Sequence, residues 1–340
     1  MVVRWRPMQR KDVPVCVEIV ASHPVIGPRY GPAINNLRSA WLRLLGYDAM
    51  TTAVFEEVND ARITIVGAGV GVFVRDEFIR ELKTPPLFWF GPELMKRITA
   101  GNSPVLTDRE VREANSGEGL NELVWETLTW TKFAKRTDVY HLMGNAYVEI
   151  HRGFLFKEMI TSQVESAERL QWAVDAGGLY WDPLRQHYAK SPPRDLGGFV
   201  TRPHVVGITR ELEFARPGSW VGTLFDYHPP RFGFSRSEQQ LMLSALTSAG
   251  GTDRELASAL NVSVPTVKKM WVSIYHRVVA RDPELIPDSA RLETGASERG
   301  REKRRRLLAY LREHPEELRP ISQRLMQRAT GTDILSRKPA

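Results

Sequence analysis

The chain has 340 residues, of which 42% are hydrophobic and 26% charged, a composition typical of folded globular proteins that excludes a wholly disordered chain. The longest strongly apolar run, residues 63–74, is too short for a membrane-spanning helix, and the first residues lack the apolar core of a signal peptide. Cys16 is the single cysteine, which excludes an internal disulfide, and we expect a cytoplasmic protein.

The positive charge lies in the last third of the chain. The net charge is +7 at neutral pH, and residues 231–340 hold 20 Lys and Arg against 13 Asp and Glu, whereas residues 1–230 hold 27 of each. A neutral body with a basic end predicts that this end meets a polyanion such as nucleic acid. A solvated basic surface is the alternative.

Strands and helices alternate in the first half of the chain. Hydrophobic periodicity and turn residues predict strands over residues 2–6, 52–58, 62–75, 122–128 and 155–163. The same signals predict helices over residues 12–21, 33–45, 76–82, 92–99, 108–115 and 138–151. Asp12 is the predicted N-cap of the first helix, and Asn59 and Asp60 are the predicted turn between two strands. We expect a mixed α/β domain over residues 1–163.

The rest of the chain divides into three predicted parts. Residues 164–234 are expected to be a helix followed by an irregular connector that is rich in Pro, Gly and aromatic residues and packs in part on the first domain. Helices are predicted over residues 235–246, 254–260 and 263–280, within an all-α domain at 235–282. Residues 283–340 are expected to form a basic helical tail, so the fold class is α+β with several domains.

Residues 254–280 have the pattern of a helix-turn-helix. Ala257 is small, as helices need where they cross, and Asn261 tolerates the left-handed backbone of a tight turn. Apolar contacts between the helices would come from Leu256, Leu260, Val262 and Val267. An ordinary helical hairpin is the alternative.

This segment resembles the DNA-binding module of LuxR-type transcriptional regulators. The matching residues are Glu255-Leu256-Ala257, Ser263, Thr266-Val267-Lys268 and Ile274-Tyr275, and FSRSEQQLMLSAL resembles the first helix of that module. The resemblance implies a C-terminal module that binds DNA as a dimer and responds to an N-terminal sensing domain. Met270 and Trp271 depart from it by being bulkier and more apolar, and the chain continues past the usual end of the module. The promoter-reading domains of sigma factors remain a related possibility.

The N-terminal region resembles GNAT acetyltransferases. Arg6-Pro7 followed by Asp12 resembles their opening, and AYVEIHRGFLFKEM, residues 146–159, resembles their late helix and strand. The resemblance implies a loop that follows a central strand, opens a helix and binds the pyrophosphate of acetyl-CoA through backbone N–H groups. No convincing Arg/Gln-x-x-Gly-x-Gly pattern is present, and residues 116–119 precede a predicted strand. We expect a degenerate GNAT-like fold, with a PAS- or GAF-like sensor as the competing architecture.

These observations predict a DNA-binding transcriptional regulator, bacterial and associated with the nucleoid, without enzymatic activity, catalytic residues, cofactor or metal. The expected partner is duplex DNA; a homodimer, RNA polymerase and an unidentified small ligand are further candidates, and no membrane is expected. Two alternatives stay open. One is an acetyl-CoA-dependent acyltransferase with an accessory helix-turn-helix, and the other is a scaffold that docks on RNA polymerase.

The predicted DNA-contacting residues are Thr252, Ser263, Val264, Pro265, Thr266, Lys268, Lys269, Ser273, Arg277, Arg304 and Arg305. Among them Thr266, Lys268 and Arg277 are expected to touch phosphates, whereas Val264, Pro265 and Lys269 are expected nearer the bases. Arg304 and Arg305 belong to the tail, for which a solvated helix face and packing against a second subunit are the alternatives.

Overall fold

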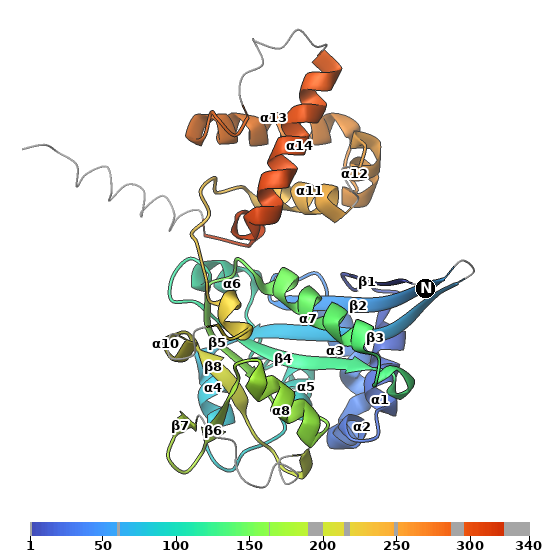
Figure 1. Cartoon of the computed structure of the whole chain (residues 1–340), viewed down its shortest axis with the longest axis vertical. Helices are drawn as coiled ribbons and strands as arrows, with labels where there is room; N and C mark the ends of the chain where they lie inside the picture. The colour runs from blue at the N-terminus through green and yellow to red at the C-terminus, as the bar shows by residue number, and fades with distance from the viewer. Residues whose placement is uncertain are drawn as a thin grey trace, which may run out of the picture. The chain divides into compact units, whose positions relative to one another are not determined.

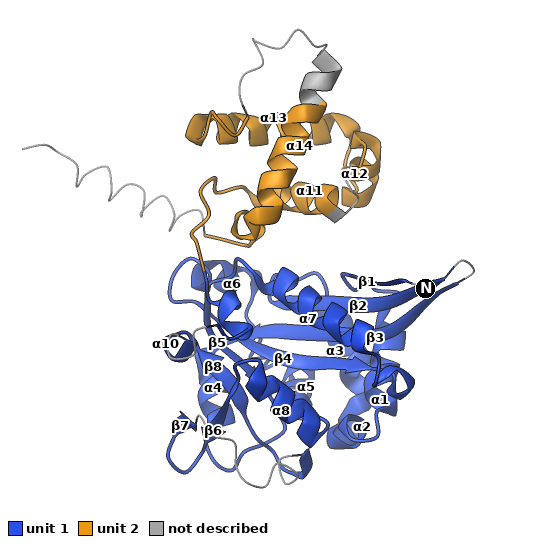
Figure 2. Ribbon diagram, in the orientation of Figure 1, with its two compact units in different colours: residues 1–226 blue, residues 227–340 orange. Residues whose placement is uncertain are grey.

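The structure, a computed structural model, describes residues 2–59, 62–162, 164–189, 200–213, 218–247, 251–286 and 296–322, with side chains from residue 301 in the last range. The chain forms two compact units, Met1–Asp226 and Tyr227–Ala340 (Figures 1 and 2). Of residues 164–234, predicted to be a helix and a connector, residues 164–226 belong to the first unit and the rest to the second. None of the helices in the described ranges is long and apolar enough to cross a membrane.

The first unit is built on one eight-stranded sheet with the strand order β1-β2-β3-β4-β5-β8-β6-β7. The strands are β1 (Val2–Arg6), β2 (Met50–Asn59), β3 (Arg62–Val74), β4 (Leu120–Thr129), β5 (Phe156–Thr161), β6 (Leu179–Asp182), β7 (His187–Ala189) and β8 (Val206–Thr209). Neighbouring strands are antiparallel except for β4 and β5, which are parallel. The mixed α/β class of this unit is confirmed. β6, β7 and β8 lie where no strand was predicted, because three or four residues carry too little alternation to be recognised.

Helices pack on both faces of this sheet (Figure 1). They are α1 (Val13–Ser22), α2 (Ile26–Tyr30), α3 (Leu37–Leu44), α4 (Asp76–Lys83), α5 (Phe90–Ala100), α6 (Asp108–Ala114), α7 (Thr137–His151), α8 (Ala167–Asp175) and α10 (Arg210–Glu213). Ala53 and Phe55 of β2 share a core with α7, whereas Val54 between them belongs to the larger core with α1, α3 and α5. Successive residues of a strand point to opposite faces, so each face has its own helical cover.

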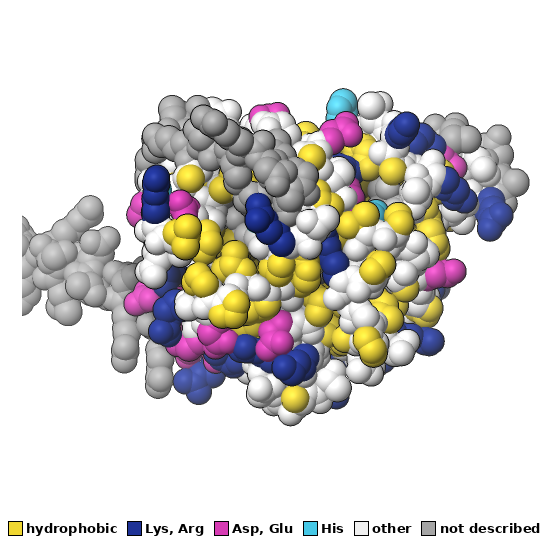
Figure 3. All heavy atoms as spheres, turned by 90° about the horizontal axis from the view of Figure 1, so that it is seen from below, with side chains coloured by type: hydrophobic (Ala, Val, Ile, Leu, Met, Phe, Trp, Pro, Cys, Tyr) yellow, Lys and Arg dark blue, Asp and Glu magenta, His cyan; other side chains and the backbone are white. Residues whose placement is uncertain are grey.

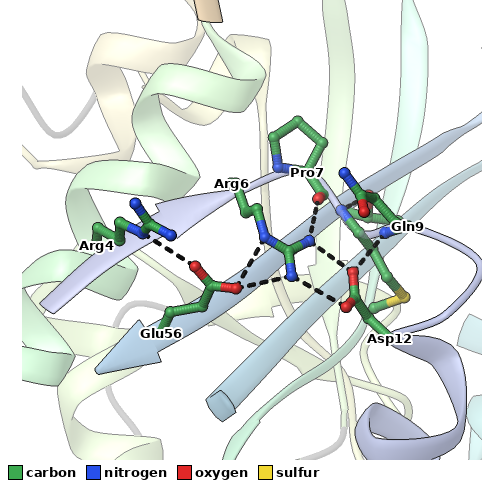
Figure 4. Close-up of polar contacts among 8 residues, drawn as sticks. Arg4, Arg6, Pro7, Gln9, Asp12 and Glu56 are labelled. Carbon is green, nitrogen blue, oxygen red and sulfur yellow. Dashed lines mark hydrogen bonds and ion pairs between the residues drawn. The ribbon is translucent and has the colours of Figure 1, made fainter. Parts of the chain in front are cut away.

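The N-terminal strand is held by a network of ion pairs (Figure 4). Arg6 donates to both carboxylate oxygens of Asp12, at 2.6 and 3.0 Å, and its Nε donates to Glu56 at 2.9 Å. Glu56 also accepts a hydrogen bond from Arg4 at 3.0 Å. The Asp12 carboxylate takes a further bond from the backbone N–H of Gln9 and makes none to α1. Asp12 therefore stands at the predicted N-cap position of α1, but its side chain makes no capping hydrogen bond because the half-buried Arg6 guanidinium occupies its carboxylate.

The described residues of the second unit form helices. They are α11 (Arg236–Thr247), α12 (Asp253–Leu260), α13 (Val264–Arg281), α14 (Ala296–Glu313) and the 3-10 turn η5 (Pro315–Leu318). Asn261 joins α12 to α13 in the left-handed conformation, with φ 52° and ψ 46°, as its residue type predicted. The side chains of Thr252 and Ser263 accept hydrogen bonds from backbone N–H groups in the first turns of α12 and α13.

Helix α14 is part of the core of the second unit. Leu307 and Leu311 are buried in the same apolar cluster as Trp271 of α13. The Arg304 guanidinium lies 4.5 Å from the centroid of the Trp271 ring and donates to Asp253 at 2.6 Å. The apolar bulk of Trp271, a departure from the LuxR-type pattern, is accounted for by this contact with α14.

Candidate functional site

Strands β4 and β5 separate along their length. They pair from Leu120 opposite Phe156 to Leu123 opposite Ile160, and beyond Leu123 the described pairing of β4 is with β3 alone. The opposite edge of β5 pairs with β8. Strand β5 ends at Thr161, so from Val124 onward this edge of β4 has no partner strand among the described residues, and its backbone N–H and C=O groups join no ladder there.

A cleft of about 180 Å³ lies at this opening. Its walls come from β4, β5 and β8 and from helices α7 and α8, and most of the lining is apolar: Val124, Met143, Ile160, Val206, Ile208 and Trp220 are among its residues. Concave apolar sites with a few polar groups are where proteins usually bind small molecules. The cleft is the candidate ligand site of the first unit.

Aromatic side chains form part of the cleft wall. Tyr147 stacks against Trp220 with ring centroids 6.0 Å apart, and the Arg169 guanidinium lies 3.5 Å from the centroid of Tyr140. Arg169 is paired with Glu165 at 2.9 Å. Trp172 of α8 also lines the cleft and is 50% exposed. Figure 3, which views the chain from below Figure 1, shows apolar side chains over much of the face that it draws, with charged side chains among and around them.

A smaller cavity of about 30 Å³ adjoins the cleft and contains a buried acid and a buried histidine. Glu122 of β4 and His151 of α7 are 0% and 3% exposed, and Nε2 of His151 lies 2.6 Å from Oε1 of Glu122. The hydroxyl of Tyr147 donates to Oε2 of Glu122 at 3.1 Å. Burial and the neighbouring carboxylate raise the pKa of Tyr147 well above its ordinary value, so it stays protonated.

The pair of Glu122 and His151 holds α7 in place. Nδ1 of His151 faces the carbonyl oxygen of Tyr147 at 2.7 Å, and because a carbonyl only accepts, Nδ1 carries a proton. Nε2 is shared between Glu122 and the hydroxyl of Thr51 at 3.1 Å, so neither ring nitrogen faces the cleft. Gly71 is required beside this pair, since a Cβ there would lie 2.6 Å from both Glu122 and Thr51.

The segment that follows the central strand β4 and opens α7 is residues 130–136. This is where the GNAT resemblance implies a pyrophosphate loop, but the segment, WTKFAKR, contains no glycine and carries Lys132, Lys135 and Arg136. Residues 116–119 precede β4, as the sequence predicted. Residues 146–159, expected as a late helix and strand, form the end of α7 and most of β5 in the middle of the sheet, because three further strands follow them.

Four of the residues predicted to contact DNA are exposed near the start of α13: Pro265, Thr266, Lys268 and Lys269. Val264 is half-buried and packs on the core of the unit. Consecutive helical residues are ~100° apart, so Lys269 lies almost opposite the buried Val267 and Lys268 lies at the flank of the exposed face.

The remaining predicted DNA contacts are engaged within the second unit. Thr252 and Ser263 serve as N-caps, Ser273 donates to the buried Glu238 at 2.8 Å, and Arg277 lies 3.6 Å from the same carboxylate. Arg304 is bound to Asp253, and Arg305 is bound to Glu302 at 2.8 Å. For these residues a role in DNA binding stays a prediction.

Comparisons with known proteins give one structural likeness to report. No protein-family model and no curated protein matches the chain. The solved structure, from Corynebacterium glutamicum, is described as histone acetyltransferase HPA2 and related acetyltransferase. Its sequence is 13% identical to this chain, and the TM-score of the two structures is 0.33. The match covers 61% of this chain and 95% of that one. That structure is of an acetyltransferase, whereas the sequence led us to expect a chain without enzymatic activity.

Proposed function

We propose that the first unit is an acyltransferase that takes an acyl group from acyl-coenzyme A bound in the cleft between β4 and β5. The separation of these two strands is the observation that carries the proposal. An extended chain with amide groups can hydrogen-bond to exposed strand edges, as an added strand does. The pantetheine arm of coenzyme A is such a chain, and the apolar walls suit the acyl group at its end.

The proposed reaction transfers the acyl group from the sulfur of coenzyme A to an acceptor. An acceptor nucleophile attacks the acyl carbonyl, the carbon–sulfur bond breaks, and the thiolate that leaves takes up the proton that the acceptor loses. Strand β4 has one extra residue, Trp125, where its register against β3 shifts between Val70 and Gly71. Such bulges re-aim backbone groups and are frequent beside active sites, and this one lies next to the cleft residue Val124.

Calorimetric titration of the full chain with acetyl-CoA tests this proposal. Gly144 of α7 lines the cleft, and a Cβ there would already lie 3.4 Å from the Trp220 ring, so Gly144→Leu should fill the space and weaken binding at least tenfold. Asn145→Leu, on the exposed side of the same helix, should bind like wild type. Release of free thiol in the presence of polyamines or a lysine-rich peptide would then report transfer. Absence of binding by wild type, or full binding by Gly144→Leu, would refute the proposal.

A second function, duplex DNA binding by the second unit, is favoured by the exposed cationic start of α13. Lys268 and Lys269 stand on a capped helix that follows a tight turn, an arrangement that suits insertion into the major groove. Fluorescence anisotropy of the full chain with a labelled duplex should show weaker binding for the double variant Lys268→Ala, Lys269→Ala. Arg312→Ala removes an exposed cation from α14 and should change the affinity less. Equal losses would mean that charge alone, and not α13, drives binding.

A further inference from the structure

The start of helix α7 is already occupied by a carboxylate of its own chain. Asp138 stands in the first turn of α7, where backbone N–H groups have no partner within the helix, and the N–H groups of Asp138 and Val139 help to lower the pKa of its carboxylate. Arg136 binds the same carboxylate through two nitrogens, at 2.5 and 2.8 Å, and binds Glu57 at 2.6 Å. Hydrogen bonds from Arg136 lower the pKa of Asp138 to about 2, so this anion persists at neutral pH.

The loop before α7 uses its backbone N–H groups internally. The N–H groups of Phe133, Ala134 and Arg136 each donate to the carbonyl oxygen three residues earlier, at 2.8, 3.2 and 3.0 Å. A phosphate-binding loop needs several N–H groups that point outward together. Residues 130–136 do not offer them, and the loop has no glycine to allow a closer approach.

The cations around the cleft opening add little fixed positive charge. Arg136 and Arg169 are neutralised by carboxylates, as described above. Lys132 and Lys135 are exposed. Exposed flexible lysines bind an anion weakly and are screened by salt. The apolar cleft is therefore better suited to bind a ligand than these cations are to bind a phosphate.

We propose that the cleft recognises its donor by the acyl-pantetheine arm, and that the nucleotide end of coenzyme A contributes little to binding. This inference rests on the acyltransferase proposal. It names the part of the donor that this chain selects, because the arm fits the opening between β4 and β5 whereas the diphosphate meets a helix end that is already filled.

Parallel titrations of the full chain with acetyl-CoA and with S-acetylpantetheine test the inference at two salt concentrations. We expect dissociation constants within tenfold of each other, both raised by Gly144→Leu, and little dependence on salt. A preference for acetyl-CoA of more than tenfold that fades at high salt would overturn the inference and leave the acyltransferase proposal standing. If neither compound binds, the acyltransferase proposal itself fails, and this inference with it.

A gain-of-affinity variant tests the role given to Asp138. Asp138→Ala removes a negative charge from the first turn of α7 and releases Arg136, so acetyl-CoA should bind three- to tenfold more tightly, with a new salt dependence. Binding of S-acetylpantetheine should not change. Glu118→Ala removes an exposed carboxylate beyond the other end of β4 and should leave both affinities unchanged. Unchanged affinity of Asp138→Ala for acetyl-CoA would show that Asp138 does not block a phosphate site.

Discussion

Replacing Arg304 with alanine should destabilise the second unit far more than replacing the adjacent Arg305. Arg304 is 21% exposed and pairs at 2.6 Å with Asp253, which is 25% exposed, and it covers the ring of Trp271. A charge-assisted hydrogen bond of this kind contributes roughly 1.5–3 kcal/mol, at the lower end when partly solvated, and a cation–π contact adds roughly 0.5–2 kcal/mol. The expected loss is therefore about 2–4 kcal/mol, a large part of the ~5–10 kcal/mol that stabilises a unit of this size.

The contrast with Arg305 makes this prediction sharp. Arg305 is 75% exposed and pairs only with Glu302, so Arg305→Ala should change the free energy of unfolding by less than about 0.5 kcal/mol. Trp271 is the one tryptophan in residues 227–340. In the full chain labelled with fluorotryptophan, its fluorine NMR resonance is therefore the one that reports unfolding of the second unit. The resonance is assigned by its loss in Trp271→Phe. A loss of 2–4 kcal/mol should lower its midpoint by roughly 10–25 °C. If both variants melt like wild type and lose DNA binding equally, the reasoning is refuted and α14 acts as a cationic surface.

Three further predictions address other parts of the chain. Lys269→Ala should reduce binding to a preferred duplex more than to a scrambled one, whereas Lys268→Ala should weaken both alike, because only Lys269 is central on the exposed face of α13; equal effects in an anisotropy assay would contradict this. Burial tends to raise the pKa of Asp12, but hydrogen bonds from Arg6 and the Gln9 backbone outweigh it, so the pKa is lowered. This carboxylate stabilises the fold above the unfolded pKa of ~3.9 and loses that effect as pH falls through its folded value, so in urea unfolding the destabilisation by Asp12→Asn should shrink between pH 7 and pH 3. Burial raises the pKa of Cys16 to about 12, so the native chain should not react with a thiol reagent at pH 8 until it is unfolded.

The parts of the fold that could be predicted from sequence depend on neighbours in the chain. Asn261 at the turn and Ser263 at the start of α13 were identified because caps and left-handed turns select particular residue types within a few positions. The long strands β2, β3 and β4 were identified for a similar reason, since each contains a run rich in apolar and β-branched residues that is long enough to be recognised. The alternation of strands and helices was enough to give the mixed class of the first unit.

The candidate site could not be predicted because its residues are distant in sequence. Thr51, Glu122 and His151 meet only after β2, β4 and α7 pack together, and no spacing in the chain links them. The separation of β4 and β5 is a property of pairing register, which single-strand patterns do not contain. Tertiary contacts also give individual groups roles that charge alone does not reveal: Arg304, predicted as a DNA contact from its charge, contacts Trp271 and Asp253 within the unit.

The short junction between β4 and β5 has a consequence for how the first unit opens. Strands β1–β4 form one half of the sheet, and β5, β8, β6 and β7 form the other. The two halves are joined by four residue pairs between β4 and β5. Native-state hydrogen exchange should find lower opening free energies for β5, β6 and β8 than for β2 and β3, whose ladder spans ten pairs. A molecule lying along the gap would bridge the halves, and saturation with it should bring the two sets of opening free energies together.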